Sequence, residues 1–477
     1  MRFSEAFGVG KAQAALDFVD IDLDRDLPLF VDPFALSIRH DEWSRRCTMH
    51  VVSFFQTAID AIHAADYERA KRVLTNLSEP NETHLGLSKE EPSGRGVSGK
   101  QAFDLYQALL DSEAAKTGLL TEIAECDLFI PGIGPDKISD ITTNVIRGLL
   151  VEYTRSQCHL HGIPMQEGVP AGRYWDMSLQ EWAGHYAALP VWQNRKILLV
   201  PKASVRFRMC LDSQEYYNHF VLNFLKAEHL NAGTALVKTF QNGTRYVTKK
   251  SLKQIHPFSK DELYRFTKAH PKVLEIYKKS ERRERADANR SLNDDEFSEA
   301  AFCDALISAL RFIPPGGAAA TDYHNLMIGA LEFIFFPNLI YPMKEREVHD
   351  GRKRIDITFT NAARDGFFHR VHTAHQIASN LVMVECKNYS GDVANPELDQ
   401  LAGRFSVNRG RLGLLLARSS DNPELFLARC RDTAQDGRGF IIPLFDIDVT
   451  ALLVKIKQGQ RASIDAYLES VLTRLMT

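Results

Sequence analysis

Apolar residues after position 297 recur in two patterns, one typical of strands and one typical of helices. Short alternating or continuous apolar runs predict strands, and the turn signal HDG joins the first two; the strands span residues 338–348, 352–361, 380–388, 411–419 and 440–448. Apolar positions at helical spacing predict helices over residues 297–313, 321–337 and 395–409. This order of elements predicts an α/β domain over residues 297–477, in which helices flank a mixed sheet.

The pattern is less regular over residues 1–285, for which we predict a mixed α/β region of unspecified fold. Helical spacing covers residues 40–75, and residues 195–209 are predicted as a strand with basic flanks. Residues 124–154 are predicted as a strand, a Gly/Pro turn and a helix that begins at Ser139 or Asp140.

Four aspartates stand at every second position from Asp20 to Asp26 in the stretch 19–33, with Val19, Ile21 and Leu23 between them, which predicts a strand with one acidic face. A calcium-binding EF-hand loop would need Gly in place of Arg25 and Glu in place of Val31. We therefore interpret the acidic face as solvated.

The composition is that of an ordinary globular chain of 477 residues, with 44% hydrophobic residues and a formal net charge of -3. It contains no apolar run of about 18 residues, which a membrane-spanning helix would need, and its start lacks the apolar core of a signal peptide. The seven cysteines form neither a CxxC pair nor a disulfide framework. These features predict a cytoplasmic protein with no membrane partner.

Positive charge is concentrated in residues 245–290, which hold 14 Lys or Arg against 6 Asp or Glu, with aromatic residues between them. A soluble charged helix would explain this segment by itself. In combination with the C-terminal residues described next, it indicates a surface that neutralises phosphates, to which we assign Lys249, Lys250 and Lys253. Its continuation, residues 286–296, is predicted as a charged linker between the two regions.

Two other motifs fail their context tests. GRGVSGKQ (94–101) has the glycines and the lysine of a phosphate-binding P-loop, but Gln101 replaces the expected Ser or Thr and no buried strand precedes it. CHLHG (158–162) offers three metal-ligating side chains without a second ligand pair at metal spacing. We interpret the first as a flexible loop and the second as structural, and keep a nucleotide-driven enzyme as the last-ranked alternative.

Charged residues stand at the ends of two predicted C-terminal strands. In RIDITF the alternation places Asp356 opposite to Ile355 and Ile357, and in VMVECK it places Glu385 and Lys387 on one face. If these strands are neighbours, two carboxylates and an ammonium converge. A divalent cation relieves the repulsion between carboxylates, and Mg²⁺ favours such oxygen ligands. The metal can polarise a scissile phosphate, and Lys387 can orient the attacking water or offset charge on phosphorus.

Neighbouring helices supply further candidates. Glu332 is the one charged residue in LMIGALEFIFF, where an unpaired carboxylate is costly, and we assign it to the metal site. Gln400 and Arg404 lie four residues apart, on one face of the helix that follows the Glu385 strand. Arg404 is assigned to nucleic-acid contact, together with Arg354.

This sequence of a helix with Glu332, a strand with Asp356, a strand with VECK and a helix with Gln400 resembles the PD-(D/E)xK nuclease superfamily, which includes restriction and phage-defence nucleases. The resemblance covers roughly residues 300–450. It implies a restriction-endonuclease-like αβββαβ core, Asp356 and Glu385 as metal ligands, and Lys387 as the catalytic lysine. Glu332 matches the helix acid found in many members, and Gln400 matches the helix glutamine found in some. RID stands in place of the Pro-Asp pair, and the gap from Asp356 to Glu385 is long, so a loop or hairpin insertion is expected there.

The function expected from these residues is a Mg²⁺-dependent endonuclease, in which Mn²⁺ can replace Mg²⁺ and DNA is the substrate, acting in prokaryotic restriction or anti-phage defence. The N-terminal region would recognise a substrate, a partner or a trigger, and a homo-oligomer or a defence-system partner protein is expected. The alternative is a catalytically inactive nuclease-like module that binds nucleic acid or assembles partners.

Overall fold

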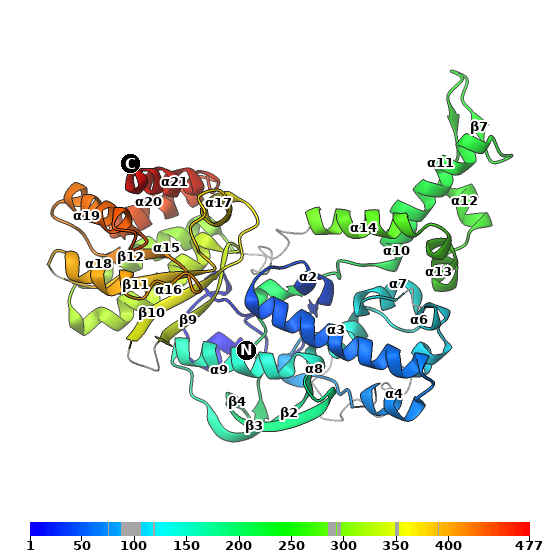
Figure 1. Cartoon of the computed structure of the whole chain (residues 1–477), viewed down its shortest axis with the longest axis horizontal. Coiled ribbons are helices and arrows are strands. Elements are labelled where there is room, and N and C mark those ends of the chain that lie inside the picture. Colours follow the sequence, from blue (N-terminus) through cyan, green and yellow to red (C-terminus); the bar gives the residue numbers. More distant parts are fainter. Residues whose placement is uncertain are drawn as a thin grey trace.

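The chain is described by a computed structural model that covers residues 1–74, 76–86, 106–117, 120–284, 292, 297–348, 353–389 and 391–477. The side chains of residues 283–284, 345–348 and 353–356 lie outside this description, and so does the P-loop-like stretch 94–101. Figure 1 shows an N-terminal region, a C-terminal domain built around a sheet, and a helical arm that projects from the N-terminal region.

The C-terminal domain contains a five-stranded mixed sheet in the order β13-β12-β11-β10-β9. The first three strands along the chain run antiparallel to one another, and the last two run parallel to the third. The strands are β9 (Leu339–Val348), β10 (Lys353–Asn361), β11 (Leu381–Lys387), β12 (Leu412–Ala417) and β13 (Phe440–Phe445). All five therefore lie where the apolar runs predict them.

Helices surround this sheet, and they include those expected near residues 297–313, 321–337 and 395–409. They are α15 (Glu299–Phe312), α16 (Ala320–Phe335), α17 (Gly366–Thr373), α18 (Asn395–Ala402), α19 (Pro423–Gln435), α20 (Asp446–Lys457) and α21 (Ser463–Met476). Helix α17 occupies the insertion between β10 and β11, where a loop or a hairpin is expected. Its residues Phe367, Phe368 and Val371 are buried, and this apolar face explains why the insertion forms a helix.

Helices α16 and α18 lie against opposite faces of β11. Met383 of β11 pairs with Gly413 of β12, where an added methyl group would lie within 3 Å of Leu401 in α18. Met383 shares its face with Glu385, so α18 covers that face. Burial raises the pKa of Tyr323 on α16, and the nearby Asp446 carboxylate and Cys386 thiol raise this pKa further. Tyr323 therefore lies near Cys386. Cys386 points away from Glu385, so α16 lies on the other face.

The N-terminal region is mainly helical. Its longest helices are α3 (Glu42–His63), which with α4 (Tyr67–Leu74) confirms the helical prediction for residues 40–75, α8 (Pro135–Val145) and α9 (Arg147–His161). A two-stranded antiparallel hairpin, β2 (Gln166–Asp176) and β3 (Glu181–Leu189), packs against α9. Shorter elements complete it: α1 (Phe3–Ala6), η1 (Gln13–Ala15), β1 (Phe30–Val31), α2 (Pro33–Ser37), η2 (Asn81–Thr83), α6 (Glu113–Lys116), η3 (Ile123–Glu125), α7 (Cys126–Phe129), β4 (Val191–Trp192), β5 (Arg195–Lys196), η4 (Lys202–Ser204) and β6 (Val205–Arg206).

Three predicted N-terminal strands are wrong or much shorter than expected. Residues 126–129 form α7. The only strands in the stretches 19–33 and 195–209 are β1, β5 and β6, each two residues long. Elsewhere in these two stretches, backbone groups form isolated hydrogen bonds to different segments, as between Val19 N–H and the Val200 carbonyl at 2.9 Å. The apolar runs reflect burial in a common core, which the period alone cannot distinguish from strand pairing.

The acidic stretch is only partly solvated, because Asp24 is exposed whereas Asp20 is buried. Asp20 is buried, and its carboxylate accepts hydrogen bonds from the Ser4 backbone N–H at 2.8 Å and the Ser4 hydroxyl at 2.7 Å. This aspartate is a structural link between the chain start and the core.

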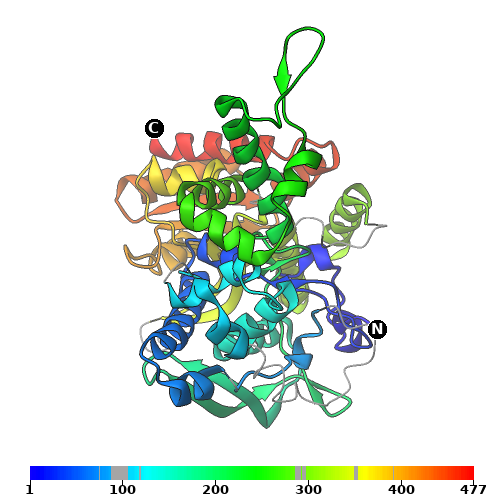
Figure 2. The same ribbon diagram turned by 90° about the vertical axis from the view of Figure 1, so that its right-hand side faces the viewer.

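The arm, which we define as Ser213–Glu284, is separated from the sheet domain in the view of Figure 1, and its tip extends beyond the rest of the molecule in Figure 2. It contains a two-stranded hairpin near its tip, where Figure 1 labels β7. Its elements are α10 (Ser213–Glu215), η5 (Tyr216–Val221), α11 (Leu222–Ala232), β7 (Lys238–Thr239), β8 (Arg245–Tyr246), α12 (Lys249–Ile255), α13 (Lys260–Ala269) and α14 (Pro271–Glu284).

Two large hydrophobic cores divide the chain close to the predicted boundary. One contains buried residues from Phe3 to Tyr277, and the other contains residues from Cys303 to Leu475. Each core also includes side chains from the other region of the chain, such as Tyr341 in the first core and Ala14 in the second. The two regions are therefore packed together. The predicted linker 286–296 lies, except for Leu292, outside the described residues.

The cysteines agree with the sequence-based prediction, since all seven are free thiols. Among the helices that the structure describes, none is both long enough and apolar enough to span a bilayer.

The contact between α18 and β12 provides a test of the sheet packing. We expect Gly413→Ala to destabilise the protein by about 1–3 kcal/mol, because the new methyl group would lie within 3 Å of Leu401 and Phe405. Gly391→Ala is the control, since nothing lies within 4 Å of its added methyl group. Thermal unfolding of both variants checks this, and equal midpoints would contradict the packing.

Candidate active site

The centre of the candidate site is the carboxyl end of β11. The apolar residues before it bury the strand between β10 and β12, and this burial extends to Glu385, which is 0% exposed. The Glu385 Oε1 atom lies 2.7 Å from the Lys387 Nζ atom. Its Oε2 atom pairs with the Arg404 guanidinium group. A buried carboxylate is strongly destabilising unless such partners compensate it, so this ion triad is what allows Glu385 to be buried.

Lys387 connects this strand to α18. Its side chain is 13% exposed, and its Nζ atom donates a hydrogen bond to Gln400 Oε1 at 3.3 Å. The same ammonium lies 5.9 Å from the centre of the Tyr389 ring. The structure therefore brings Glu385, Lys387 and Gln400 together, as the sequence predicts.

The backbone register locates the second expected carboxylate. Strands β10 and β11 pair antiparallel with Ile357 opposite Val384. Continuing this register by one residue puts position 356 opposite Glu385. The side chains of Asp356 and of Arg354 lie outside the described residues, so the structure leaves both assignments as predictions.

Glu332 is not part of this group, because it lies on α16 and faces the N-terminal region. It is 2% exposed, and among the described residues neither carboxylate oxygen has a hydrogen-bond partner. Burial raises the pKa of Glu332 to about 8, against the opposing effect of the nearby Lys11 and Lys202 ammonium groups. The prediction that Glu332 joins Glu385 is therefore corrected: its charged neighbours come from the N-terminal region.

Gly329 allows this approach. It lies one helical turn before Glu332, and a methyl group there would come within 3.2 Å of the Ala15 methyl group and 3.7 Å of the Lys11 ammonium. The absence of a side chain on Gly329 lets the segment of Lys11 and Ala15 pack closely on α16. Burial also lowers the pKa of Lys11, whose Nζ atom has no hydrogen-bond partner in the part of the chain that the structure describes.

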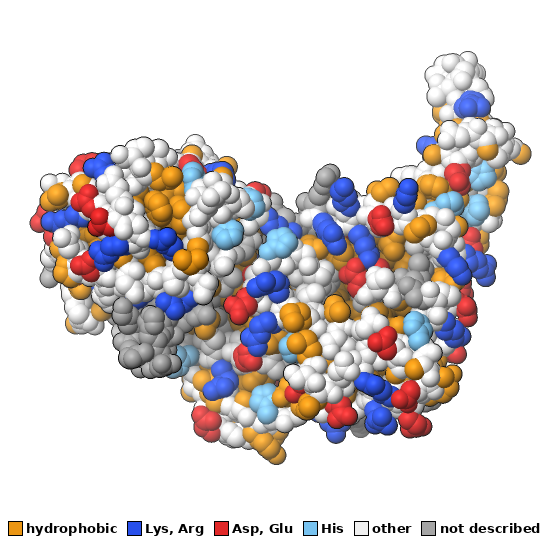
Figure 3. Space-filling view, in the orientation of Figure 1, with side chains coloured by type: hydrophobic (Ala, Val, Ile, Leu, Met, Phe, Trp, Pro, Cys, Tyr) orange, Lys and Arg blue, Asp and Glu red, His pale blue; other side chains and the backbone are white. Residues whose placement is uncertain are grey.

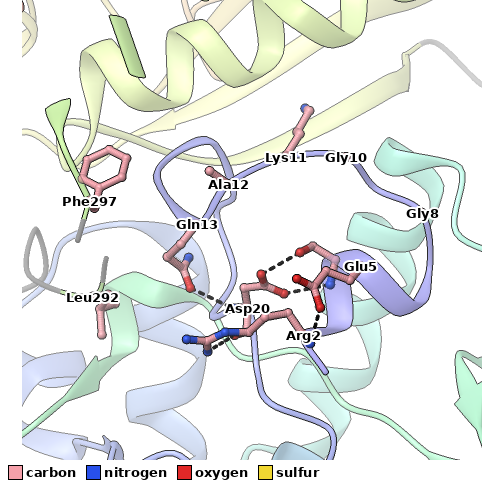
Figure 4. Close-up of a pocket in the computed structure, with 11 residues that line it drawn as sticks. Arg2, Glu5, Gly8, Gly10, Lys11, Ala12, Gln13, Asp20, Leu292 and Phe297 are labelled. Carbon is pink, nitrogen blue, oxygen red and sulfur yellow. Dashed lines mark hydrogen bonds between the residues drawn. The ribbon is translucent and has the colours of Figure 1, made fainter. Parts of the chain in front are cut away.

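A pocket of about 430 Å³ is lined by residues near the chain start, Lys11 among them. Figure 4 shows that Lys11 points away from the Asp20 carboxylate, whereas Arg2, Glu5 and Gln13 gather around it. These three groups are already hydrogen-bonded within the chain, as in the Glu5 carboxylate that accepts the Arg2 backbone N–H at 3.0 Å. The residues that line the pocket include none from β11, the strand that carries Glu385.

The basic residues assigned to nucleic acid fall into two environments. Arg404 is 6% exposed and paired with Glu385, so it is a buried partner of the carboxylate and not the predicted phosphate contact. The expected helical face ends early, because α18 stops at Ala402. Lys249, Lys250 and Lys253 are exposed on α12, where solvent and ligands can reach them.

The described residues contain no group of three His, Cys, Asp or Glu side chains that could hold a metal ion. This does not exclude the predicted site, since Mg²⁺ is usually held by one or two protein carboxylates together with substrate phosphate and water. Glu385 supplies one such oxygen donor, and position 356 opposite it is an aspartate in the sequence. The residue types therefore fit a hard divalent cation.

Comparison with known proteins gives one match. A family model described as "Domain of unknown function (DUF8370)" matches residues 8–212. This range ends directly before the arm, which begins at Ser213, and it contains Lys11 and Lys202, the neighbours of Glu332. No curated protein and no solved structure matches the chain.

Glu332 predicts a pH dependence of stability. Because its pKa in the folded chain, about 8, lies above the ordinary value of 4.5, the folded state holds an extra proton between these values. Stability then decreases as the pH rises through this window. We expect Glu332→Gln to reduce the loss of thermal midpoint between about pH 5 and pH 8, by about 1 °C for each kcal/mol removed in a chain of 477 residues.

The control for this prediction is Glu228→Gln, which removes an exposed carboxylate from α11. Thermal unfolding of the wild type and both variants at the two pH values measures the effect. If Glu332→Gln lost as much midpoint as the wild type, the raised pKa would be wrong.

Proposed function

We propose that the C-terminal domain is a metal-dependent nuclease that hydrolyses phosphodiester bonds, with DNA as its substrate. The observation that carries this proposal is the close group of Glu385, Lys387 and Gln400 at the end of β11. Carboxylate, ammonium and amide are the side chains expected at a site that binds a divalent cation and a phosphate.

The connectivity of the domain also supports this. Helix α16 is followed by the antiparallel strands β9, β10 and β11, then by α18 and by β12, which runs parallel to β11. This is the αβββαβ order expected from the resemblance to PD-(D/E)xK nucleases. In that order the Glu385 strand is central, and the glutamine helix directly follows it.

Each residue has a chemical role in the proposal. The carboxylates at positions 385 and 356 would hold Mg²⁺ or Mn²⁺, which polarises a phosphate and lowers the pKa of bound water. The Lys387 ammonium stands 2.7 Å from the Glu385 carboxylate, so beside a metal held there it would offset the negative charge that develops on the phosphate. Gln400 accepts a hydrogen bond from Lys387 and restricts the direction of its ammonium. Glu332 has no role in this site.

The alternative is a nuclease-like module that binds nucleic acid or partners without cutting. One observation favours it: Lys387 and Arg404 already flank the two oxygens of Glu385, so the carboxylate is compensated without a metal. The two functions differ in whether a cation competes with these partners for Glu385.

For the biological role, we propose restriction or anti-phage defence. This rests on analogy with other nucleases of this type that carry a separate recognition region.

The proposal predicts that Lys387→Ala abolishes cleavage, with a loss of at least about 100-fold, the usual contribution of one preorganised charge in an active site. The assay incubates the full chain with plasmid, linear duplex and single-stranded DNA, with Mg²⁺ or with EDTA. Lys455→Ala on α20 is the control, since it removes a lysine of the same domain and should retain activity.

Two results would contradict the proposal. Lys387→Ala that cuts as well as Lys455→Ala would exclude the assigned lysine. A wild-type chain that binds DNA but leaves every substrate intact with both Mg²⁺ and Mn²⁺ would favour the binding module.

A further inference from the structure

The tip of the arm has an unusual charge distribution. Residues 229–260 contain six Lys or Arg and no Asp or Glu, although the whole chain is slightly acidic. One of the six, Lys260, is paired with Asp127 of the N-terminal region, which leaves five for the tip. Figure 3 shows that the arm stands apart from the remaining surface and carries Lys and Arg side chains near its tip. Lys238 of β7 and Lys250 of α12 are both exposed. A surface with cations and no acids in this stretch favours a polyanionic partner.

A pair of aromatic rings lies within this basic surface. Phe240 is 52% exposed, and its ring stacks on that of Tyr246 with centres 4.0 Å apart and planes 22° apart. Lys238 pairs with Tyr246 across the hairpin, and Phe240 is two residues after Lys238. These three side chains therefore share one face of the ribbon.

The hairpin turn holds this face outward. Phe240 and Thr244 are joined by a backbone hydrogen bond of 2.9 Å, and the turn between them includes Gly243 at a φ of 81°, a conformation that favours glycine. The Phe240 ring is exposed, although burying it would be favourable. Exposed aromatic rings beside cations are the combination that holds unpaired bases, because each base can stack on a ring while its phosphate meets a cation.

We propose that the arm tip, formed by Lys238, Phe240, Tyr246 and the lysines of α12, binds single-stranded segments of nucleic acid. The inference rests on the proposed function for its setting, since an arm that grips an unpaired strand would bring substrate to the nuclease domain. It goes beyond that function by assigning a second contact site, remote from Glu385, and a strand preference.

The test measures the affinity of the full chain for a labelled single-stranded oligonucleotide and for the matching duplex, in EDTA so that no cleavage occurs. We expect Phe240→Ala and Phe240→Leu to weaken single-strand binding roughly tenfold, the loss of one base stack, whereas Phe240→Trp retains it. Phe240→Leu is the decisive variant, because it keeps the apolar bulk of the hairpin and removes the aromatic face.

The charge part of the surface is tested by salt dependence. The double variant Lys238→Gln/Lys250→Gln should reduce the slope of log affinity against log salt by about 1.4, as expected for two phosphate contacts on a single strand. The matched control is Arg45→Gln/Arg155→Gln, which removes two exposed cations from α3 and α9, and Tyr186→Ala, which removes an exposed ring from β3.

Affinity that is the same in the arm variants and the controls would overturn the proposal, as would a duplex bound more tightly than the single strand. Because binding is measured without cleavage, the two proposals fail separately. If the chain never cuts DNA but the arm variants lose single-strand binding, the arm site is supported and the nuclease proposal is not.

Discussion

The arrangement of the C-terminal domain depends on one constraint, the complete burial of the Glu385 carboxylate. Water cannot compensate this charge, so two cations must lie beside it, and the fold supplies them from different places. Lys387 comes from the same strand face. Arg404 comes from the segment after α18, which can reach Glu385 because α18 packs closely on β12 at Gly413. The helix, the strand pair and the ion triad are therefore one unit.

A second buried carboxylate connects the two regions of the chain. Glu332 on α16 meets Lys11 and Lys202, both within the range matched by the family of unknown function. The same junction includes Tyr341 of β9, whose backbone N–H donates to the Asp17 carboxylate at 3.0 Å. The C-terminal domain is thus packed against the N-terminal region through buried polar groups, each of which has its partner on the other region. It is not connected by the chain alone.

The sequence predicts the C-terminal sheet well because its information is local. Each strand is a short apolar run with turn residues at its ends, and the alternation that places Glu385 and Lys387 on one face is a property of any strand. The interpretation fails where the partner of a residue is set by distant packing. No residue near Glu332 in the sequence indicates that Lys11 will be its neighbour. Lys11 is more than 300 residues away, and it approaches α16 where Gly329 has no side chain.

The same reason explains the errors in the N-terminal region. Residues 19–33 and 195–209 have the composition of strands, but their backbone groups bond to irregular neighbours inside one large core. The periodicity of apolar residues indicates which residues are buried, but it does not indicate which other segment of the chain lies beside them. The arm hairpin is not among the predicted elements, although the sequence contains a hairpin turn signal. This signal is the Asn242–Gly243 pair, which forms the turn between Phe240 and Arg245.

The central claim is that Glu385 binds a catalytic cation at the end of β11. The most direct measurement is a Mn²⁺ titration, followed by electron paramagnetic resonance of the free ion, of the Lys387→Ala chain with and without Glu385→Gln, in the presence of DNA. We predict that the chain with Glu385 removes Mn²⁺ from solution in proportion to its concentration and that the Glu385→Gln chain does not. Equal uptake by both chains, or uptake by neither, would contradict a metal-dependent nuclease site at the end of β11.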